Sequence, residues 1–136
     1  MRFASREWIE AVVAAANAHP DLAKAVAGLP RDAAFVVEAD GPGFPGTVAV
    51  YAEQQAGRVA RWRILPDEDD LLELEPAYVF RARHGAWKAL LEGADPMKAA
   101  LSGQVRVQGD LEALVRRSGY RYVIDAALAA VSTEFA

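Results

Sequence analysis

Residues 87–111 read WKALLEGADPMKAALSGQVRVQGDL, and this stretch decides the fold because its glycines divide it into short elements. Asp95 caps one helix, Pro96 occupies the first turn of that helix, and Gly103 ends it. The helix before it carries core-facing side chains at helical spacing and stops at a glycine: Trp87, Leu90, Leu91 and Gly93. The stretch therefore places two helices before Gly103.

A strand and a third helix follow Gly103. Val105 and Val107 alternate with polar residues, which is typical of a short strand with one buried face. Gly109 then turns the chain, and Asp110 caps a helix whose inward side chains are Leu111, Leu114 and Val115.

Farther along the chain, residues 120–131 form the last predicted helix. One stripe of this helix contains Ile124, Leu128 and Val131, and alanines make most of its remaining surface apolar. A helix that is apolar on nearly every side is expected to be covered on more than one side.

Two helices are also predicted at the start of the chain. Ser5 caps a helix that runs to about Ala18, with Trp8 and Ile9 on its apolar stripe. Pro20 suits the first turn of a short second helix. The first thirty residues are thus expected to be helical.

From residue 33 on, apolar residues recur at every second position, as in a strand, and no longer at helical spacing. Residues 33–39, 47–53 and 59–64 predict three strands of an antiparallel meander, and residues 77–83 predict a fourth strand. Residues 71–76 carry no pattern that assigns them to an element. Large apolar side chains gather on one face of the four strands: Phe35, Val37, Val48, Val50, Trp62, Tyr78 and Phe80.

The composition limits the classes of function. The 136 residues carry 15 basic and 19 acidic side chains, a net charge of -4, and no cysteine. Nucleic-acid binding normally requires a cationic surface, and this balance argues against it. No apolar run approaches the ~20 residues of a membrane span. We expect one cytoplasmic α/β domain over residues 1–136, without stable membrane insertion.

No motif in the sequence indicates catalysis. His19 and His84 lack metal-ligand spacing to nearby acids, and neither Ser102 nor Ser118 lies in a nucleophile motif. Residues 103–109 are rich in glycine but lack the lysine of a phosphate-binding loop. We therefore expect no catalytic residue, no metal and no cofactor.

Arginines alternate with apolar residues on the predicted strands and leave two interpretations open. Arg61, Arg63, Arg81 and Arg83 indicate either a solvated sheet face or an anchor for an acidic headgroup or a coenzyme A phosphate. The large apolar residues on the other face also fit two structures, a packed core or the lining of a tunnel, and periodicity does not distinguish them.

The stretch 87–111 resembles the family of sterol carrier protein 2. The family pattern joins a helix with a tryptophan, a glycine, a second helix, and a strand and turn of the form Gly-x-hydrophobic-x-hydrophobic-x-Gly-Asp. Residues 103–110, GQVRVQGD, match that strand and turn. The resemblance implies an α+β fold with a five-stranded mixed sheet, covering helices, and a hydrophobic tunnel between sheet and helices.

The resemblance also implies a function. It implies non-catalytic binding, and transfer, of a lipid-like ligand such as a fatty acyl chain, a sterol-like molecule or an isoprenoid. The apolar character of the 120–131 helix on nearly every side further suggests that one face packs on the domain while Ile124, Leu128 and Val131 close the tunnel as a lid. The candidate lining residues are Phe35, Val37, Val48, Val50, Trp62, Tyr78, Phe80, Trp87, Met97, Leu101, Leu114, Ile124 and Leu128.

Two other functions stay open at this point. The domain could serve as an accessory or homodimerisation module for an enzyme of lipid or quinone synthesis, which requires an exposed apolar patch. It could also act as an acyl-coenzyme A thioesterase-like enzyme, which requires a polar nucleophile or base facing the pocket.

Overall fold

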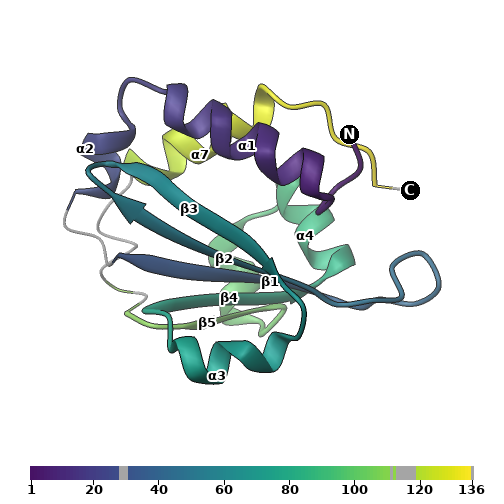
Figure 1. The fold of residues 1–136 in the computed structure, drawn as a ribbon. Coiled ribbons are helices and arrows are strands. Elements are labelled where there is room, and N and C mark those ends of the chain that lie inside the picture. The colour runs from purple at the N-terminus through teal and green to yellow at the C-terminus, as the bar shows by residue number, and fades with distance from the viewer. Residues whose placement is uncertain (28–30, 111, 113–118, 136) are drawn as a thin grey trace.

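A five-stranded mixed sheet forms the centre of the molecule in the computed structural model, which describes residues 1–27, 31–110, 112 and 119–135 (Figure 1). The strand order is β3-β2-β1-β4-β5. β1 pairs antiparallel with β2 and parallel with β4, while β2–β3 and β4–β5 are antiparallel. The strands are β1 Asp32–Glu38, β2 Val48–Gln55, β3 Arg58–Leu65, β4 Tyr78–Arg83 and β5 Val105–Gln108.

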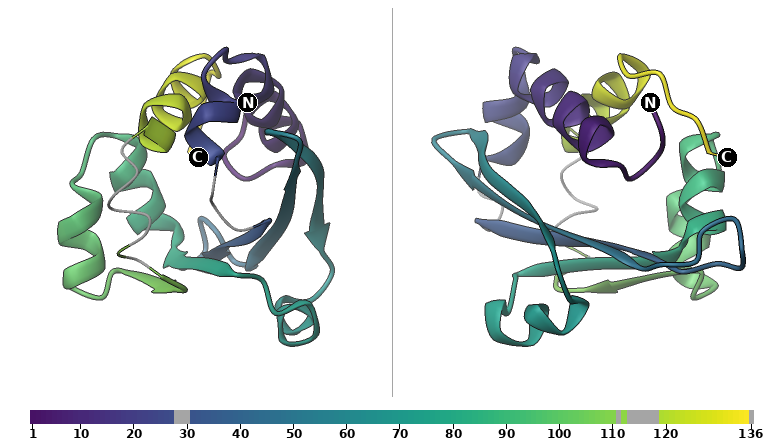
Figure 2. Two further views of the ribbon diagram at one scale, coloured as in Figure 1. Left: turned by 90° about the vertical axis from the view of Figure 1, so that its left-hand side faces the viewer. Right: turned by 45° about the vertical axis from the view of Figure 1, so that its right-hand side comes forward.

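Helices cover both faces of this sheet. α1, α2 and α7 lie over one face, which we call the inner face, and α3 lies against the other, the outer face (Figures 1 and 2). The helices are α1 Arg6–Ala18, α2 Leu22–Val26, α3 Leu71–Leu74, α4 His84–Leu91, α5 Pro96–Leu101 and α7 Gly119–Ala129, with a 3₁₀ turn at Glu68–Asp70. The fold predicted from the sequence is confirmed, and the helix expected after Asp110 falls largely outside the described residues.

The predicted helix caps are present. The Ser5 hydroxyl accepts a hydrogen bond of 3.2 Å from the Trp8 amide at the start of α1. The Asp95 carboxylate accepts one of 2.9 Å from the Met97 amide at the start of α5. Each side chain satisfies an amide that has no partner within its own helix, so these two boundaries follow from single residues.

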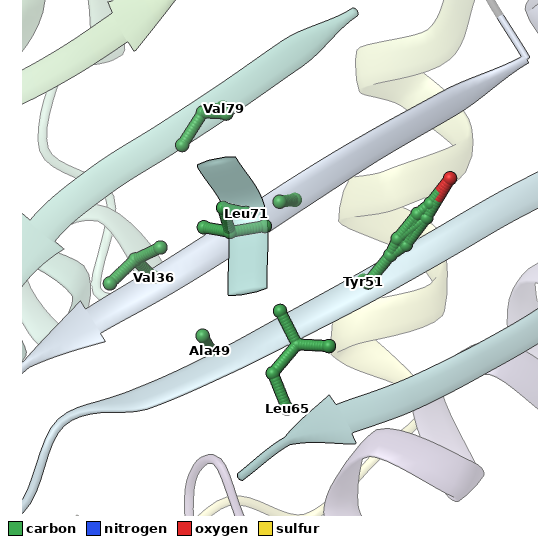
Figure 3. Packing of buried hydrophobic residues seen from close by; sticks show 7 residues of the cluster. Val36, Ala49, Tyr51, Leu65, Leu71 and Val79 are labelled. Carbon is green, nitrogen blue, oxygen red and sulfur yellow. The ribbon is translucent and has the colours of Figure 1, made fainter. Parts of the chain in front are cut away.

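α3 is the element that the sequence did not assign. Its Leu71 lies over the outer face, against the side chains of Val36, Ala49 and Leu65 (Figure 3). Ala34 and Val36, which point to this face, have no exposed surface. A helix of four residues is too short to be stable alone, so packing on the sheet holds it.

The turn between β2 and β3 packs on α2. Ala56 and Gly57 both have positive φ, 54° and 76°, as the right-handed twist of a tight hairpin favours. A Cβ on Gly57 would lie 2.6 Å from the Cβ of Ala23, which no real contact tolerates. Glycine therefore permits both the turn and the close approach of the hairpin to the helix.

The two ends of the chain pair with each other. Arg2 and Glu134 form an isolated parallel bridge, in which the Phe3 amide donates to the Glu134 carbonyl at 2.8 Å and the Glu134 amide donates to the Met1 carbonyl at 2.7 Å. The Trp8 indole nitrogen also donates to the Thr133 hydroxyl at 2.9 Å. These contacts hold the two terminal segments side by side.

Candidate functional site

The strand register brings the predicted apolar side chains together on the inner face. Phe35 on β1 lies opposite Val50 on β2 and Phe80 on β4. Val37 lies opposite Val48 in the next row. The rings of Phe35 and Phe80 stack with centroids 5.3 Å apart, so the middle of this face is a continuous apolar surface.

Aromatic side chains continue this surface along β4 and onto the edge strand β3. Tyr78, on β4, stacks on Phe80 at 5.9 Å, and its hydroxyl donates a hydrogen bond of 2.7 Å to the carbonyl of Asp110. Trp62 lies on β3, with the guanidinium of Arg6 5.5 Å from its ring centre. Tyr78, Phe80 and Trp62 were all predicted to line the ligand site.

The inner face is less completely covered than the outer face. Ala34 and Val36 on β1 are fully buried on the outer side, whereas Phe35 between them keeps part of its surface accessible. Its neighbours Val50 and Phe80 are also partly accessible. A packed interior leaves almost no accessible surface on the central strand of a sheet covered on both sides. The side chains of Phe35, Val50 and Phe80 therefore leave accessible apolar surface in the middle of the inner face.

The end of the inner face at Val37 is tightly packed. Val37 is 6% exposed and contacts Phe3, Trp8 and Trp87 in one cluster. Trp87 also contacts the cluster around Ala82, and its indole nitrogen donates to the Val36 carbonyl at 3.0 Å. Trp87 thus joins α4 to the sheet at this closed end.

The predicted lining residues on the helices differ in exposure. Met97 and Leu101 are 39% and 81% exposed, because α5 packs on the sheet through the small side chain of Ala99. Ile124 is 44% exposed, and Leu128 is partly buried. Leu114 lies outside the described residues.

One side of α7 packs on the neighbouring helices. The residues that the described part of α7 buries most deeply are Val123 and Ala127, which are 1% and 2% exposed and lie beside the stripe of Ile124, Leu128 and Val131 that was predicted to close the tunnel. Val123 packs against Leu22 and Ala25 of α2, so neighbouring helices select the buried side. In a helix with apolar residues on most sides, the sequence alone does not identify that side.

One residue of this surface was left out of the predicted lining. Ile64 on β3 lies opposite Val50, on the same face as Trp62. The alternation of Trp62 and Ile64 with arginines was visible in the sequence and was sufficient to find it.

Charged side chains lie on the outer side of the strands. The Arg81 guanidinium forms ion pairs with Glu68 at 2.9 Å and Glu38 at 3.5 Å, and Arg106 pairs with Glu38. Among the described residues of the five strands, no charged side chain and no serine or histidine lies on the inner face. That face offers an apolar ligand contact area, and the Tyr78 hydroxyl on it donates its hydrogen to the Asp110 carbonyl.

A buried tyrosine forms part of the same outer side. The Tyr51 hydroxyl donates a hydrogen bond of 2.7 Å to one oxygen of Asp32, whose other oxygen accepts from the Ala77 amide at 2.8 Å. Burial, followed by the hydrogen bond to Asp32, raises the pKa of Tyr51 to about 12.

Two open grooves lie apart from the inner face. A groove of about 610 Å³ is lined by residues of α2 and of the turn at 56–57, and one of about 920 Å³ lies beside the start of α4. The larger groove has a polar lining that includes Glu38, Asp40, Arg83 and Arg106. Neither groove is lined by a residue of the predicted tunnel lining, whereas Arg83, in the larger groove, is one of the arginines for which a headgroup anchor was left open.

Comparison with protein families gives the identity of the domain. The model of the SCP-2 sterol transfer family matches residues 14–119. The chain belongs to this family. SCP-2 domains are lipid-binding and generally non-catalytic. The SCP-2 match includes all five strands together with α4 and α5, and it ends where α7 begins.

Solved structures show the same fold. A solution structure from Thermus thermophilus, of a conserved hypothetical protein described as possibly a sterol carrier protein, has a TM-score of 0.73 at 23% identity and covers 94% of this chain and 89% of its own. A crystal structure of sterol carrier protein 2 has a TM-score of 0.68 at 22% identity and covers 93% and 94%. An SCP-2 structure described as the ubiquinone synthesis protein UbiJ has a TM-score of 0.54 at 18% identity, with 88% and 87% covered.

Among curated protein sequences, none matches this chain significantly. Within the described ranges, no helix has the length and apolar character needed to cross a membrane.

Proposed function

We propose that residues 1–136 form one SCP-2 domain that binds a lipid-like ligand between the inner face and the covering helices and performs no chemistry on it. The observation that carries this proposal is the accessible apolar surface at Phe35, Val50 and Phe80, in the middle of a covered sheet. A fatty acyl chain, a sterol-like ring system or an isoprenoid fits a surface of this kind. The proposed contacts are Phe35, Val37, Val48, Val50, Trp62, Ile64, Tyr78 and Phe80.

Burial of the ligand provides the binding energy. Each methylene removed from water contributes about 0.8 kcal/mol, so about eight methylenes contribute roughly 6 kcal/mol before the cost of association. The aromatic rings of Phe35 and Phe80 supply a broad contact area at little conformational cost. The Tyr78 hydroxyl already bonds a backbone carbonyl, so the ligand does not have to satisfy it.

Binding of a fluorescent fatty acid tests the proposal. We expect saturable, one-to-one binding of cis-parinaric acid to the purified domain, and native mass spectrometry of the same sample should show the added mass. Phe80→Glu places a carboxylate on the apolar surface and should weaken binding at least about tenfold, or 1.4 kcal/mol. Leu101→Glu is the matched control, because Leu101 is 81% exposed. Equal affinity in the two variants would contradict the proposed site.

The non-catalytic part of the proposal has its own test. The domain should not hydrolyse palmitoyl-coenzyme A above the uncatalysed rate, because the described residues of the strands place no serine, histidine or carboxylate on the inner face and its Tyr78 hydroxyl bonds a backbone carbonyl. Turnover that persists through purification and is abolished by one polar substitution would contradict it.

A second candidate function is an accessory role in quinone synthesis. Its support is the likeness to the structure described as UbiJ, a ubiquinone synthesis protein. In that role, deletion of the gene for this chain should lower the quinone content of its host. Complementation by Phe80→Glu would indicate a role that does not need the ligand surface, whereas failure to complement would link quinone synthesis to lipid binding.

A further inference from the structure

Two side-chain contacts attach α1 to the edge strand β3. Near the end of the helix, the Asn17 side chain accepts a hydrogen bond from the Val59 amide at 2.8 Å and donates one to the Val59 carbonyl at 3.1 Å. In the first turn of the helix, the guanidinium of Arg6 lies 5.5 Å from the centre of the Trp62 ring. Arg6 is thereby placed over the β3 side of the inner face.

The positive charge of Arg6 is not neutralised by a neighbour. Within the described part of the chain, its side chain forms no ion pair and no hydrogen bond. Glu7 and Glu10, the acids of the same helix, are exposed. A cation over an aromatic ring is attracted by the electrons of the ring, and its N–H donors stay available for other partners. Arg6 therefore presents a fork of donors beside Trp62.

The arginines of the strands lie on the other side of the sheet. Arg61 and Arg63 alternate with Trp62 along β3, so their side chains point to the outer side. Arg81 is held on that side by ion pairs. The strand arginines, for which a headgroup anchor was left open, are thus separated by the sheet from the apolar surface, whereas Arg6 lies over one of its rings.

A row of apolar side chains crosses the inner face next to Trp62. From β3 to β4 its members are Ile64, Val50, Phe35 and Phe80, each opposite the next. The row spans three spacings between strands, about 14 Å. An amphiphile whose tail lies along it has its polar end either at β3, beside Arg6, or at β4.

The two ends of this row differ in their polar groups. At β4, the Tyr78 hydroxyl donates its hydrogen to the Asp110 carbonyl at 2.7 Å. At β3, the Arg6 guanidinium offers positive charge and several donors. Carboxylates and phosphates bind a guanidinium through paired, charge-assisted hydrogen bonds, which an ester or an alcohol does not form. This difference orients an anionic amphiphile with its head at β3.

We propose that Arg6 binds the anionic head group of the ligand, a carboxylate or a phosphate, while the tail lies on the inner face. This inference rests on the lipid-binding function proposed above and narrows its ligands to amphiphiles with an anionic head. Trp62 contacts the tail and positions the guanidinium with the same ring. Neutral molecules of the same apolar size bind more weakly.

Two fluorescent probes with the same tail test the proposal. At pH 8 cis-parinaric acid carries a carboxylate, and its methyl ester is neutral. We expect the whole protein to bind the acid at least about tenfold more tightly than the ester, and Arg6→Gln to bind both with the affinity of the ester. Arg6→Lys keeps the charge without the fork and should show an intermediate preference. Added salt should weaken binding of the acid and not of the ester.

Arg83→Gln is the matched control, because Arg83 is an exposed arginine on the outer side of β4. It should keep the full preference for the acid. Displacement of cis-parinaric acid by palmitate and by hexadecyl phosphate compares the two head groups. Acetate and inorganic phosphate at the same concentrations should not displace it, because the tail supplies most of the binding energy. Arg6 is itself exposed, so Arg6→Gln should fold normally, as circular dichroism can verify.

Several results would overturn the proposal and leave lipid binding intact. These are equal affinity of the wild type for acid and ester, an equal loss of both probes in Arg6→Gln, a lost preference in Arg83→Gln, and displacement of the probe by acetate or inorganic phosphate. Binding of neither probe by the wild type would instead contradict the proposed function, and this inference with it.

Discussion

The indole nitrogen of Trp87, on α4, donates a hydrogen bond of 3.0 Å to the carbonyl oxygen of Val36, on the central strand β1. The same ring packs between the clusters around Val37 and Ala82. The tryptophan that contributed to the family resemblance therefore fixes a helix to the sheet at the closed end of the inner face. Its position indicates a structural role beside the proposed ligand surface.

Trp87→Phe should lower stability and leave ligand binding intact. The substitution keeps an aromatic ring but leaves the Val36 carbonyl without its donor, which should reduce the free energy of unfolding by about 1–2 kcal/mol. Urea denaturation followed by circular dichroism measures the change. If Trp87 instead contacted the ligand, affinity for cis-parinaric acid would fall while the folded protein stayed as stable as the wild type.

Leu71→Ala should destabilise the protein through the outer face. Leu71 is 8% exposed and lies over Val36 and Leu65, so its truncation should cost about 2–3 kcal/mol. The neighbouring Leu72→Ala is the control, because Leu72 is 77% exposed and its truncation should change stability by less than about 0.5 kcal/mol. Both variants should bind cis-parinaric acid normally. Equal destabilisation of the two would show that α3 does not pack as described.

Tyr51 should make stability depend on pH in the alkaline range. Its pKa is raised from 10.0 to about 12, so the folded protein holds the phenolic proton more tightly than the unfolded chain. This contribution to stability is fully present below about pH 10 and is lost as the pH rises toward about 12. The Tyr51→Phe variant has no phenolic proton to lose. At pH 8 its free energy of unfolding should be about 1–2 kcal/mol lower than that of the wild type, because Asp32 loses a hydrogen bond.

Paired unfolding curves check this expectation. The free energies of unfolding of the wild type and Tyr51→Phe, measured in urea from about pH 8 to about pH 11.5, should converge as the pH rises above about 10. A constant difference across that range would show that Tyr51 titrates alike in the folded and unfolded states.

The lid hypothesis is tested at Leu128 on α7. Leu128 is partly buried, and Leu128→Glu places a charge that water solvates only if the helix moves away. We expect loading with cis-parinaric acid to fall at least about tenfold while the sheet stays folded. Ala129→Glu, at an exposed position of the same helix, should bind normally. Unchanged binding in Leu128→Glu, or loss of binding only together with global unfolding, would reject the lid.

The sequence predicted those parts of the fold that depend on local patterns. Alternation at Phe35, Val50 and Phe80 identified both the strands and the face that they share, and Ser5 and Asp95 identified two helix starts. The mixed character of the sheet came only from the family resemblance, and the parallel pairing of β1 with β4 was not predicted, because strand partners far apart in sequence leave no local signal.

The candidate site was harder to predict than the fold. Met97 and Leu101 were predicted to line the tunnel, but the residue that α5 buries against the sheet is Ala99, which packs with Ala82 and Val105. The exposure of Ile124 depends on which side of α7 packs against α2, and Val123 occupies that side. Which side of a helix is buried depends on its contacts with other elements, and the sequence of that helix alone does not specify those contacts.

The pairing of Arg2 with Glu134 gives the described chain a ring-like connectivity, closed by hydrogen bonds in place of a peptide bond. A short glycine-rich linker between the ends would therefore close the ring covalently with little strain. The exposed connection at residues 40–47, between β1 and β2, would then be a suitable place to open new ends, because no strand or helix is interrupted there. The order of elements along such a permuted chain would change, yet the sheet, its inner face and the edge at β3 would all be retained.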